Sequence, residues 1–183
     1  MPGFRTRWGW LIAASLLAIA QTRGESRLSE YEVKAAFLYK FATYVRWPPQ
    51  SAAVTDAPFV IGVIGKDPFG RALDAVMKGQ SVHGRAVVVK RLARPEEALR
   101  CQVVFVCSSE RGALRQILGT LNGAPVLTVG DTDRFAEQGG MINLTTEENH
   151  IRFEINKRAI DRAGLKVASQ LLGLARIVDE EKP

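Results

Sequence analysis

The sequence predicts a single three-layer α/β/α domain built on a mostly parallel sheet with an antiparallel hairpin at its edge. Four short apolar-rich runs alternate with helical segments, which is the pattern of a parallel sheet covered by helices on both faces. After the fourth run the alternation stops, and two further runs joined by a short polar loop are typical of an antiparallel hairpin. The four runs are Phe59–Ile64, Ala86–Arg91, Val103–Val106 and Pro125–Val129, and the hairpin extends over Met141–Ile155.

The first helix is predicted over Tyr31–Pro48, the segment YEVKAAFLYKFATYVRWP. Ser29 and Glu32 have the spacing of a capping box at its start, and the proline pair that begins at Pro48 ends it. The segment carries six of the eleven aromatic residues that follow position 20. About two thirds of its surface is apolar, whereas a surface helix needs a stripe of only about 100°. The excess needs an explanation.

Two interpretations of this helix are open. In one, it is buried on two sides, against the sheet and beneath a last helix predicted over Leu165–Val178. In the other, some of its apolar side chains enter the core and others are left to meet a partner or a second copy of the chain. The core set would be Val33, Phe37 and Tyr44, and the partner-binding set Tyr31, Leu38 and Val45.

The remaining helices follow from capping residues and helix breakers. Asp67 and Pro68 suit the start of the second helix, Ser108 or Ser109 caps the fourth, and Asn156 caps the one before Gly164. The predicted ranges are Phe69–Lys78, Pro95–Leu99, Glu110–Leu121, a short helix around Asp133–Gln138, and Asn156–Ala163.

The first twenty residues have the features of a signal peptide. Arg5 and Arg7 precede the short apolar run Trp10–Ala20, and Ala18-Ile19-Ala20 offers the small residues of a cleavage site. The run is about half of the ~20 residues that a membrane span requires. We therefore expect export with a cut after Ala20, which leaves residues 21–183 as the mature domain. Loss of the two arginines lowers the net charge from +6 to +4.

The mature charge is mild for a chain of this length. Lysines and arginines are scattered among acids and form no run, which gives no support to nucleic-acid binding. No later segment is apolar for long enough to cross a membrane.

Cys101 and Cys107 are the two cysteines. A predicted strand lies between them and separates them by roughly 20 Å, against the ~4–7 Å that a disulfide allows. We expect two buried thiols at the ends of a core strand. An intermolecular or redox-labile thiol is the alternative.

No catalytic constellation is evident. His83 and His150 both lie beside turn residues, and neither has further ligands at metal-binding spacing. The segment Gly62–Gly70 lacks the spacing of a phosphate loop, and Ser108 and Ser109 lack the glycines of a nucleophile elbow. No enzyme activity, metal or cofactor is therefore predicted. A small exported hydrolase would need a nucleophile that the sequence does not offer.

A small-ligand-binding protein remains an alternative. Its ligand would lie at the carboxyl ends of the strands, near Gly65–Asp67 and Ser108–Glu110, where open α/β sheets often bind ligands.

Three stretches resemble the YfiR family. They are YEVKAAFLYKFATYVRWP (Tyr31–Pro48), FVIGVIGKDPFGRAL (Phe59–Leu73) and GGMINLTTEENHIRFEINKRAIDRAGLKVASQLLGLA (Gly139–Ala175). The resemblance covers nearly all of the mature chain, and three long motifs in order are far more specific than a short pattern.

The resemblance implies a periplasmic α/β protein without enzymatic activity. It implies that the chain binds and represses the periplasmic domain of an inner-membrane signalling protein. This partner is most simply a diguanylate cyclase, whose repression lowers cyclic-di-GMP signalling; a sensor kinase is the other partner considered. An outer-membrane lipoprotein that removes the repressor would be a second partner, and a homodimer is left open. The family's use of internal disulfides is not carried over, because Cys101 and Cys107 are badly placed to pair.

Overall fold

The computed structural model describes residues 29–49 and 57–179. The predicted signal peptide, residues 1–20, lies outside the described residues, as does most of the linker predicted between Pro48 and Pro58.

Among the described residues, the central sheet has eight strands in the order β10-β8-β7-β6-β5-β2-β4-β3. The neighbours from β4 to β7 in this order are parallel, and β7 and β8 form an antiparallel hairpin. The predicted α/β class with a mostly parallel sheet is confirmed. The strands are β2 (Phe59–Ile64), β3 (Ser81–Val82), β4 (Arg85–Leu92), β5 (Val103–Val106), β6 (Leu127–Gly130), β7 (Ile142–Glu147), β8 (His150–Asn156) and β10 (Arg176–Val178).

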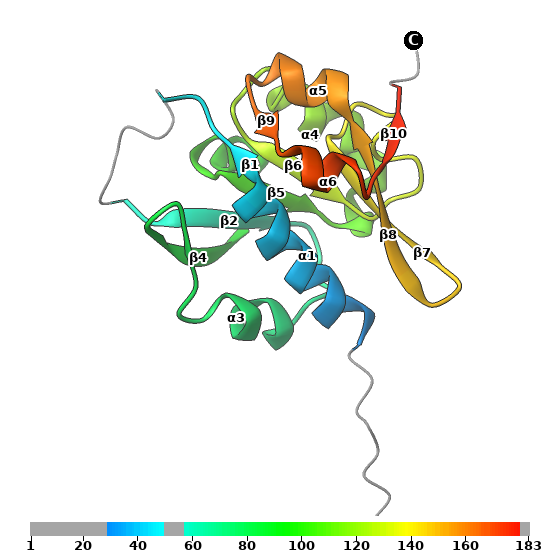
Figure 1. The fold of residues 1–183 in the computed structure, drawn as a ribbon. Coiled ribbons are helices and arrows are strands. Elements are labelled where there is room, and N and C mark those ends of the chain that lie inside the picture. Colours follow the sequence, from blue (N-terminus) through cyan, green and yellow to red (C-terminus); the bar gives the residue numbers. More distant parts are fainter. Residues whose placement is uncertain (1–28, 50–56, 180–183) are drawn as a thin grey trace, which may run out of the picture.

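Helices cover both faces of this sheet (Figure 1). The α-helices are α1 (Glu30–Tyr44), α3 (Arg71–Met77), α4 (Leu114–Thr120), α5 (Lys157–Arg162) and α6 (Ser169–Leu172). Two 3-10 helices, η1 (Pro95–Arg100) and η2 (Ser108–Ala113), flank β5. A separate pair of antiparallel strands joins β1 (Val45–Arg46) to β9 (Lys166–Val167).

Two hydrophobic cores result from the alternation of side chains along the buried strands. On β5, Val103 and Phe105 enter the core under α1, α3, α5 and α6, while Val104 and Val106 enter the core under η1 and α4. Strand β2 is buried along its whole length. Its continuous apolar sequence is therefore explained by helices on both sides.

The start of α1 is as predicted. The Ser29 side chain accepts a hydrogen bond from the Glu32 amide, and the Glu32 carboxylate accepts one from the Ser29 amide, at 3.3 and 2.5 Å. The end of α1 differs from the prediction. The helix stops at Tyr44 because Val45 is extended (φ −103°, ψ 142°) and pairs with Val167 of β9.

The helix predicted over Leu165–Val178 is wrong. This segment forms β9, α6 and β10 in succession, and its apolar residues fit a helical spacing only by coincidence. Its backbone groups are satisfied by distant partners: the Ala168 amide donates to the Tyr44 carbonyl at 2.9 Å, and β10 pairs in parallel with β8. As a result, β10 rather than the β7–β8 hairpin forms the edge of the sheet.

Two smaller predictions also fail. The segment around Asp133–Gln138 consists of turns, in which Phe135 is fully buried. Asp67 does not cap α3; it closes a local turn by accepting the Phe69 amide at 2.8 Å, and α3 begins only after Gly70.

Candidate functional site

The predicted partner-binding set on α1 needs correction. Leu38 and Val45 have no exposed surface and belong to the core, so the expectation that they are left exposed for a partner is wrong. Tyr44, expected in the core, is 41% exposed. The reason is that α1 is enclosed by the sheet, α3 and the segment of α6, whose Leu171 joins the same core. Tyr31 is half-buried at the start of the helix.

A buried ion pair fixes the first turns of α1 to the sheet. The Lys34 ammonium lies 2.8 Å from the Asp131 carboxylate, and each side chain is only 4% exposed. The Tyr31 hydroxyl donates to the same carboxylate oxygen at 2.9 Å, and burial together with that negative charge raises the pKa of Tyr31. Lys34 also contacts Glu30 at 2.6 Å. Asp131 directly follows β6, so this cluster holds α1 across the carboxyl end of the parallel strands.

The position predicted for a small ligand is occupied by the chain itself. Strands β2 and β5 are neighbours at the switch point of the sheet, where such folds often bind ligands. There the Ser109 hydroxyl accepts the Lys66 amide at 2.9 Å. A Cβ atom on Gly65 would come within 2.5 Å of that hydroxyl oxygen, and the φ of Gly65 is +96°. Gly65 therefore allows η2 to close over the end of β2.

Cys101 and Cys107 are free and buried, as the strand between them predicts. Cys101 packs in the core under α4, whereas Cys107 packs in the core under α1, on the opposite face of the sheet. Burial raises the pKa of Cys101 to about 11 and, with help from Asp67 and Asp131, that of Cys107 to about 12.

Both thiols are expected to be unreactive in the folded protein. At about pH 8 a pKa of about 11 leaves a thiolate fraction of about 10⁻³. Reaction with a thiol-specific disulfide reagent should be at least about 100-fold slower in the native protein than in denaturant. Because both pKa values are raised on folding, the stability contributed by the neutral thiols is full below about pH 8.5 and is lost as the pH rises through 11 to 12. Rapid native labelling of either cysteine would contradict this prediction.

The two histidines lie at the surface, as predicted. His83 Nε2 lies 3.0 Å from the Val45 carbonyl and helps to hold the end of α1, which is a structural role. His150 begins β8, and its Nδ1 lies 2.8 Å from the Glu148 carbonyl. Within residues 29–49 and 57–179, no three His, Cys, Asp or Glu side chains are grouped to hold a metal ion.

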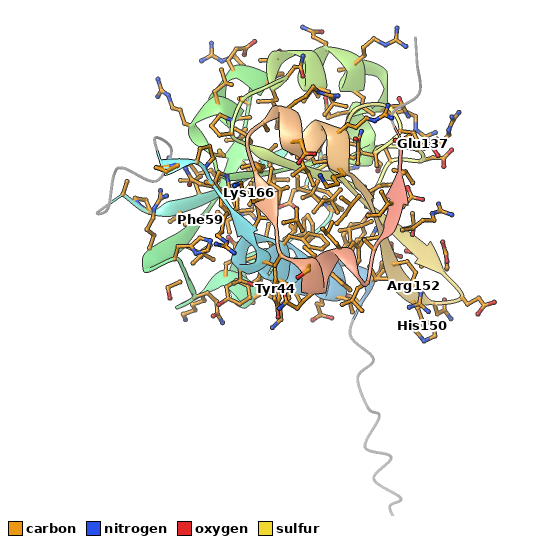
Figure 2. The ribbon with its side chains drawn as sticks, turned by 45° about the horizontal axis from the view of Figure 1, so that its top comes forward. Tyr44, Phe59, Glu137, His150, Arg152 and Lys166 are labelled. Atoms are coloured by element: carbon orange, nitrogen blue, oxygen red, sulfur yellow. The ribbon has the colours of Figure 1, made fainter. Side chains whose placement is uncertain are left out.

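An open groove of about 900 Å³ lies between the first half of α1 and the β7–β8 hairpin; we call it the α1–β8 groove. Val33, Phe37 and Ile151 provide its apolar surface. Its polar lining consists of Glu30, Thr146, Glu148, Asn149, His150 and Arg152. Figure 2 shows His150 and Arg152 on the hairpin, well away from Tyr44 at the far end of α1.

The hairpin that forms one wall has a defined geometry. Glu148 and Asn149 both have positive φ, 47° and 62°, so they form a two-residue turn of the type that matches strand twist. A hydrogen bond connects the hairpin to α1: the Thr146 hydroxyl donates to the Glu30 carboxylate at 3.1 Å.

Sequence reasoning did not find this groove. It placed Val33 and Phe37 in the core, whereas both are only half-buried and line the groove. It placed Ile151 in a hairpin, where the structure also has it. The alternation of Ile151, Arg152 and Phe153 predicted a strand, but not that α1 would lie beside it.

Taken together, these observations describe an α/β domain with an open groove between its first helix and the β7–β8 hairpin. Residues 31–176 match the family described as YfiR/HmsC-like, and the chain belongs to this family. The family is regulatory and non-catalytic, and it acts in the periplasm on diguanylate cyclase signalling through a membrane signalling protein. Within the described part of the chain, no helix is long and apolar enough to span a bilayer.

Two solved structures share the fold. A conserved domain protein from Vibrio cholerae O1 biovar El Tor superposes with a TM-score of 0.57 at 15% identity, over 83% of this chain and 61% of that one. The ABC domain from Streptococcus pneumonia in complex with L-Trp gives a TM-score of 0.50 at 10% identity, over 66% of this chain and 55% of that one. The chain thus spans about three fifths or less of the length of these neighbours, and at such identities the likeness concerns the fold alone.

Proposed function

We propose that this chain is an exported repressor that binds the periplasmic domain of an inner-membrane diguanylate cyclase and holds the enzyme inactive, so lowering cyclic-di-GMP. The observation that carries the proposal is membership of the YfiR/HmsC-like family over residues 31–176. The α1–β8 groove supports it, because an open apolar surface with a polar rim is suited to protein binding. A sensor kinase is the alternative membrane partner, and an outer-membrane lipoprotein is proposed as the factor that removes the repressor.

The proposed export depends on residues 1–20, with residues 21–183 as the mature protein. Deleting the gene is expected to raise cyclic-di-GMP and surface attachment, and full-length protein should restore both. A version without residues 2–20 should fold but fail to restore them, because it would not reach the periplasm. The measurements are cyclic-di-GMP by mass spectrometry, immunoblots of periplasmic fractions, and co-purification with the membrane cyclase.

Two results would argue against the proposal. Unchanged cyclic-di-GMP in the deletion strain would exclude a cyclase as the target, and co-purification with a kinase instead would favour the alternative partner. Full repression by the version confined to the cytoplasm would contradict the periplasmic site of action.

A further inference from the structure

Among the residues that the structure describes, part of β8 has no neighbouring strand on its outer side. Strand β10 pairs with β8 only at Glu154, Ile155 and Asn156. In the described part of the chain, no strand pairs with the outer side of His150–Phe153. This open edge borders the α1–β8 groove.

The direction of the free backbone groups follows from the hairpin register. The Asn156 amide donates to the Met141 carbonyl at 2.9 Å and so points toward β7. Because backbone groups alternate along an antiparallel strand, the amides of Ile151 and Phe153 point outward, away from β7. The edge thus presents two amide donors, those of Ile151 and Phe153, and the Ile151 carbonyl as an acceptor to an incoming extended chain.

The two faces of this edge differ in chemistry. Ile151 pairs with Thr146, which contacts Glu30 of α1, so its side chain is on the α1 face with Val33 and Phe37. Successive side chains of a strand point to opposite faces, which puts Arg152 on the other face. An extended segment added here would place alternate side chains against apolar surface and beside Arg152.

The positive charge of Arg152 favours an acidic residue in a segment that binds beside it. The Arg152 side chain is exposed, and it makes no hydrogen bond or ion pair with another residue of 29–49 or 57–179. Further along the same face, Arg176 is paired with the buried Glu154 carboxylate, which therefore does not serve Arg152. Of the acids that line the groove, Glu30 already binds Lys34 and Thr146, and Glu148 lies in the turn beyond the strand.

We propose that the open edge of β8 at His150–Phe153 binds an extended segment of a protein partner by β-strand addition, with apolar side chains facing α1 and an Asp or Glu between them beside Arg152. Main-chain hydrogen bonds provide the affinity. The apolar surface on the α1 face and Arg152 on the other face select the alternating side chains of the segment. The inference rests on the proposed function, since it specifies how that function's partner is recognised.

The test begins with octapeptides selected from a random phage-displayed library on the mature chain purified from the periplasm. Enriched peptides should alternate apolar residues with at least one Asp or Glu. Their affinity, measured by fluorescence anisotropy with labelled synthetic peptide, should fall at least about tenfold for Ile151→Pro, which removes one outward amide at a position where an edge strand tolerates proline. Methylating alternate amides of the peptide should have the same effect without altering the protein.

Charge reversal supplies the second comparison. Arg152→Glu should weaken the acidic peptides about tenfold or more, and selection on this variant should enrich Lys or Arg in place of the acid. Arg111→Glu, an exposed reversal on η2, is the matched control and should leave binding unchanged.

The proposal is overturned if no peptide is enriched, or if the enriched peptides bind wild type, Ile151→Pro and Arg152→Glu alike. It is also overturned if the chain sediments as a dimer that Ile151→Pro dissociates, because the edge would then serve a second copy. Repression of cyclic-di-GMP that survives both variants would overturn the inference alone. Peptide binding without any effect of the chain on cyclic-di-GMP would instead count against the proposed function.

Discussion

Replacing Asp131 by alanine is expected to lower the free energy of unfolding by about 3 kcal/mol, the low end for a buried ion pair that loses one partner. The Lys34 ammonium would remain in a site where its side chain is 4% exposed, and its remaining acid, Glu30, is 46% exposed. The Tyr31 hydroxyl would lose its acceptor as well. Urea or thermal unfolding followed by circular dichroism measures the change, which corresponds to a fall in Tm of roughly 6–12 °C.

Asp161→Ala is the matched control for this prediction. Asp161 binds Lys157 at 2.6 Å, but both side chains are more than half exposed, so the loss should be within about 0.5 kcal/mol. Replacing Lys34 by Met and Asp131 by Leu together should restore much of the stability, because no buried charge is then left alone. Equal effects of Asp131→Ala and Asp161→Ala would show that the buried pair does not hold α1.

Replacing Phe41 by alanine is expected to cost about 3–5 kcal/mol, the range for removing a large buried aromatic side chain. Phe41 has no exposed surface, and its ring centroid lies 5.2 Å from that of Phe153 and 5.7 Å from that of Phe37. The cavity would open between α1 and β8, beneath the α1–β8 groove, so the groove should lose shape along with stability.

Tyr44→Ala is the control on the same helix. Tyr44 lies three residues further along and is 41% exposed, so its loss should cost about 1 kcal/mol or less. Chemical denaturation with the same probe compares the two variants. If Tyr44→Ala proved as destabilising as Phe41→Ala, the orientation of α1 described above would be wrong.

Lys34 shows why composition alone misjudges this helix. On a helical wheel its long stem suits a side chain that reaches solvent, as exposed Lys40 does. Its actual environment depends on Asp131, which is 97 positions away in sequence and directly follows β6. The pairing exists only because the sheet brings the end of β6 under the first turns of α1, and no local pattern reports that.

The candidate site could be predicted only in its parts. The alternation of Ile151, Arg152 and Phe153 indicated a strand, and Val33 and Phe37 were assigned to the core, whereas they line the groove. Whether that strand has an open edge depends on where β10 begins, and β10 lies in a segment whose spacing predicted a helix. Two of the three residues predicted to bind a partner, Leu38 and Val45, are buried for a related reason: their enclosure depends on α3, α6 and β9, which are far along the chain.

Features that depend on neighbouring residues could be predicted from the amino-acid sequence. These are the capping box of α1, the buried parallel strands, the hairpin, the Asn156 cap of α5 and the separation of the two cysteines, all of which arise from local hydrogen bonds and side-chain periodicity. Four other features depend on how the chain packs in three dimensions: the end of α1 in β1, the division of Leu165–Val178 among β9, α6 and β10, the burial of Lys34 and the open edge of β8. Each of these depends on hydrogen bonds or charges supplied by residues distant in sequence, which become available only when the sheet has formed.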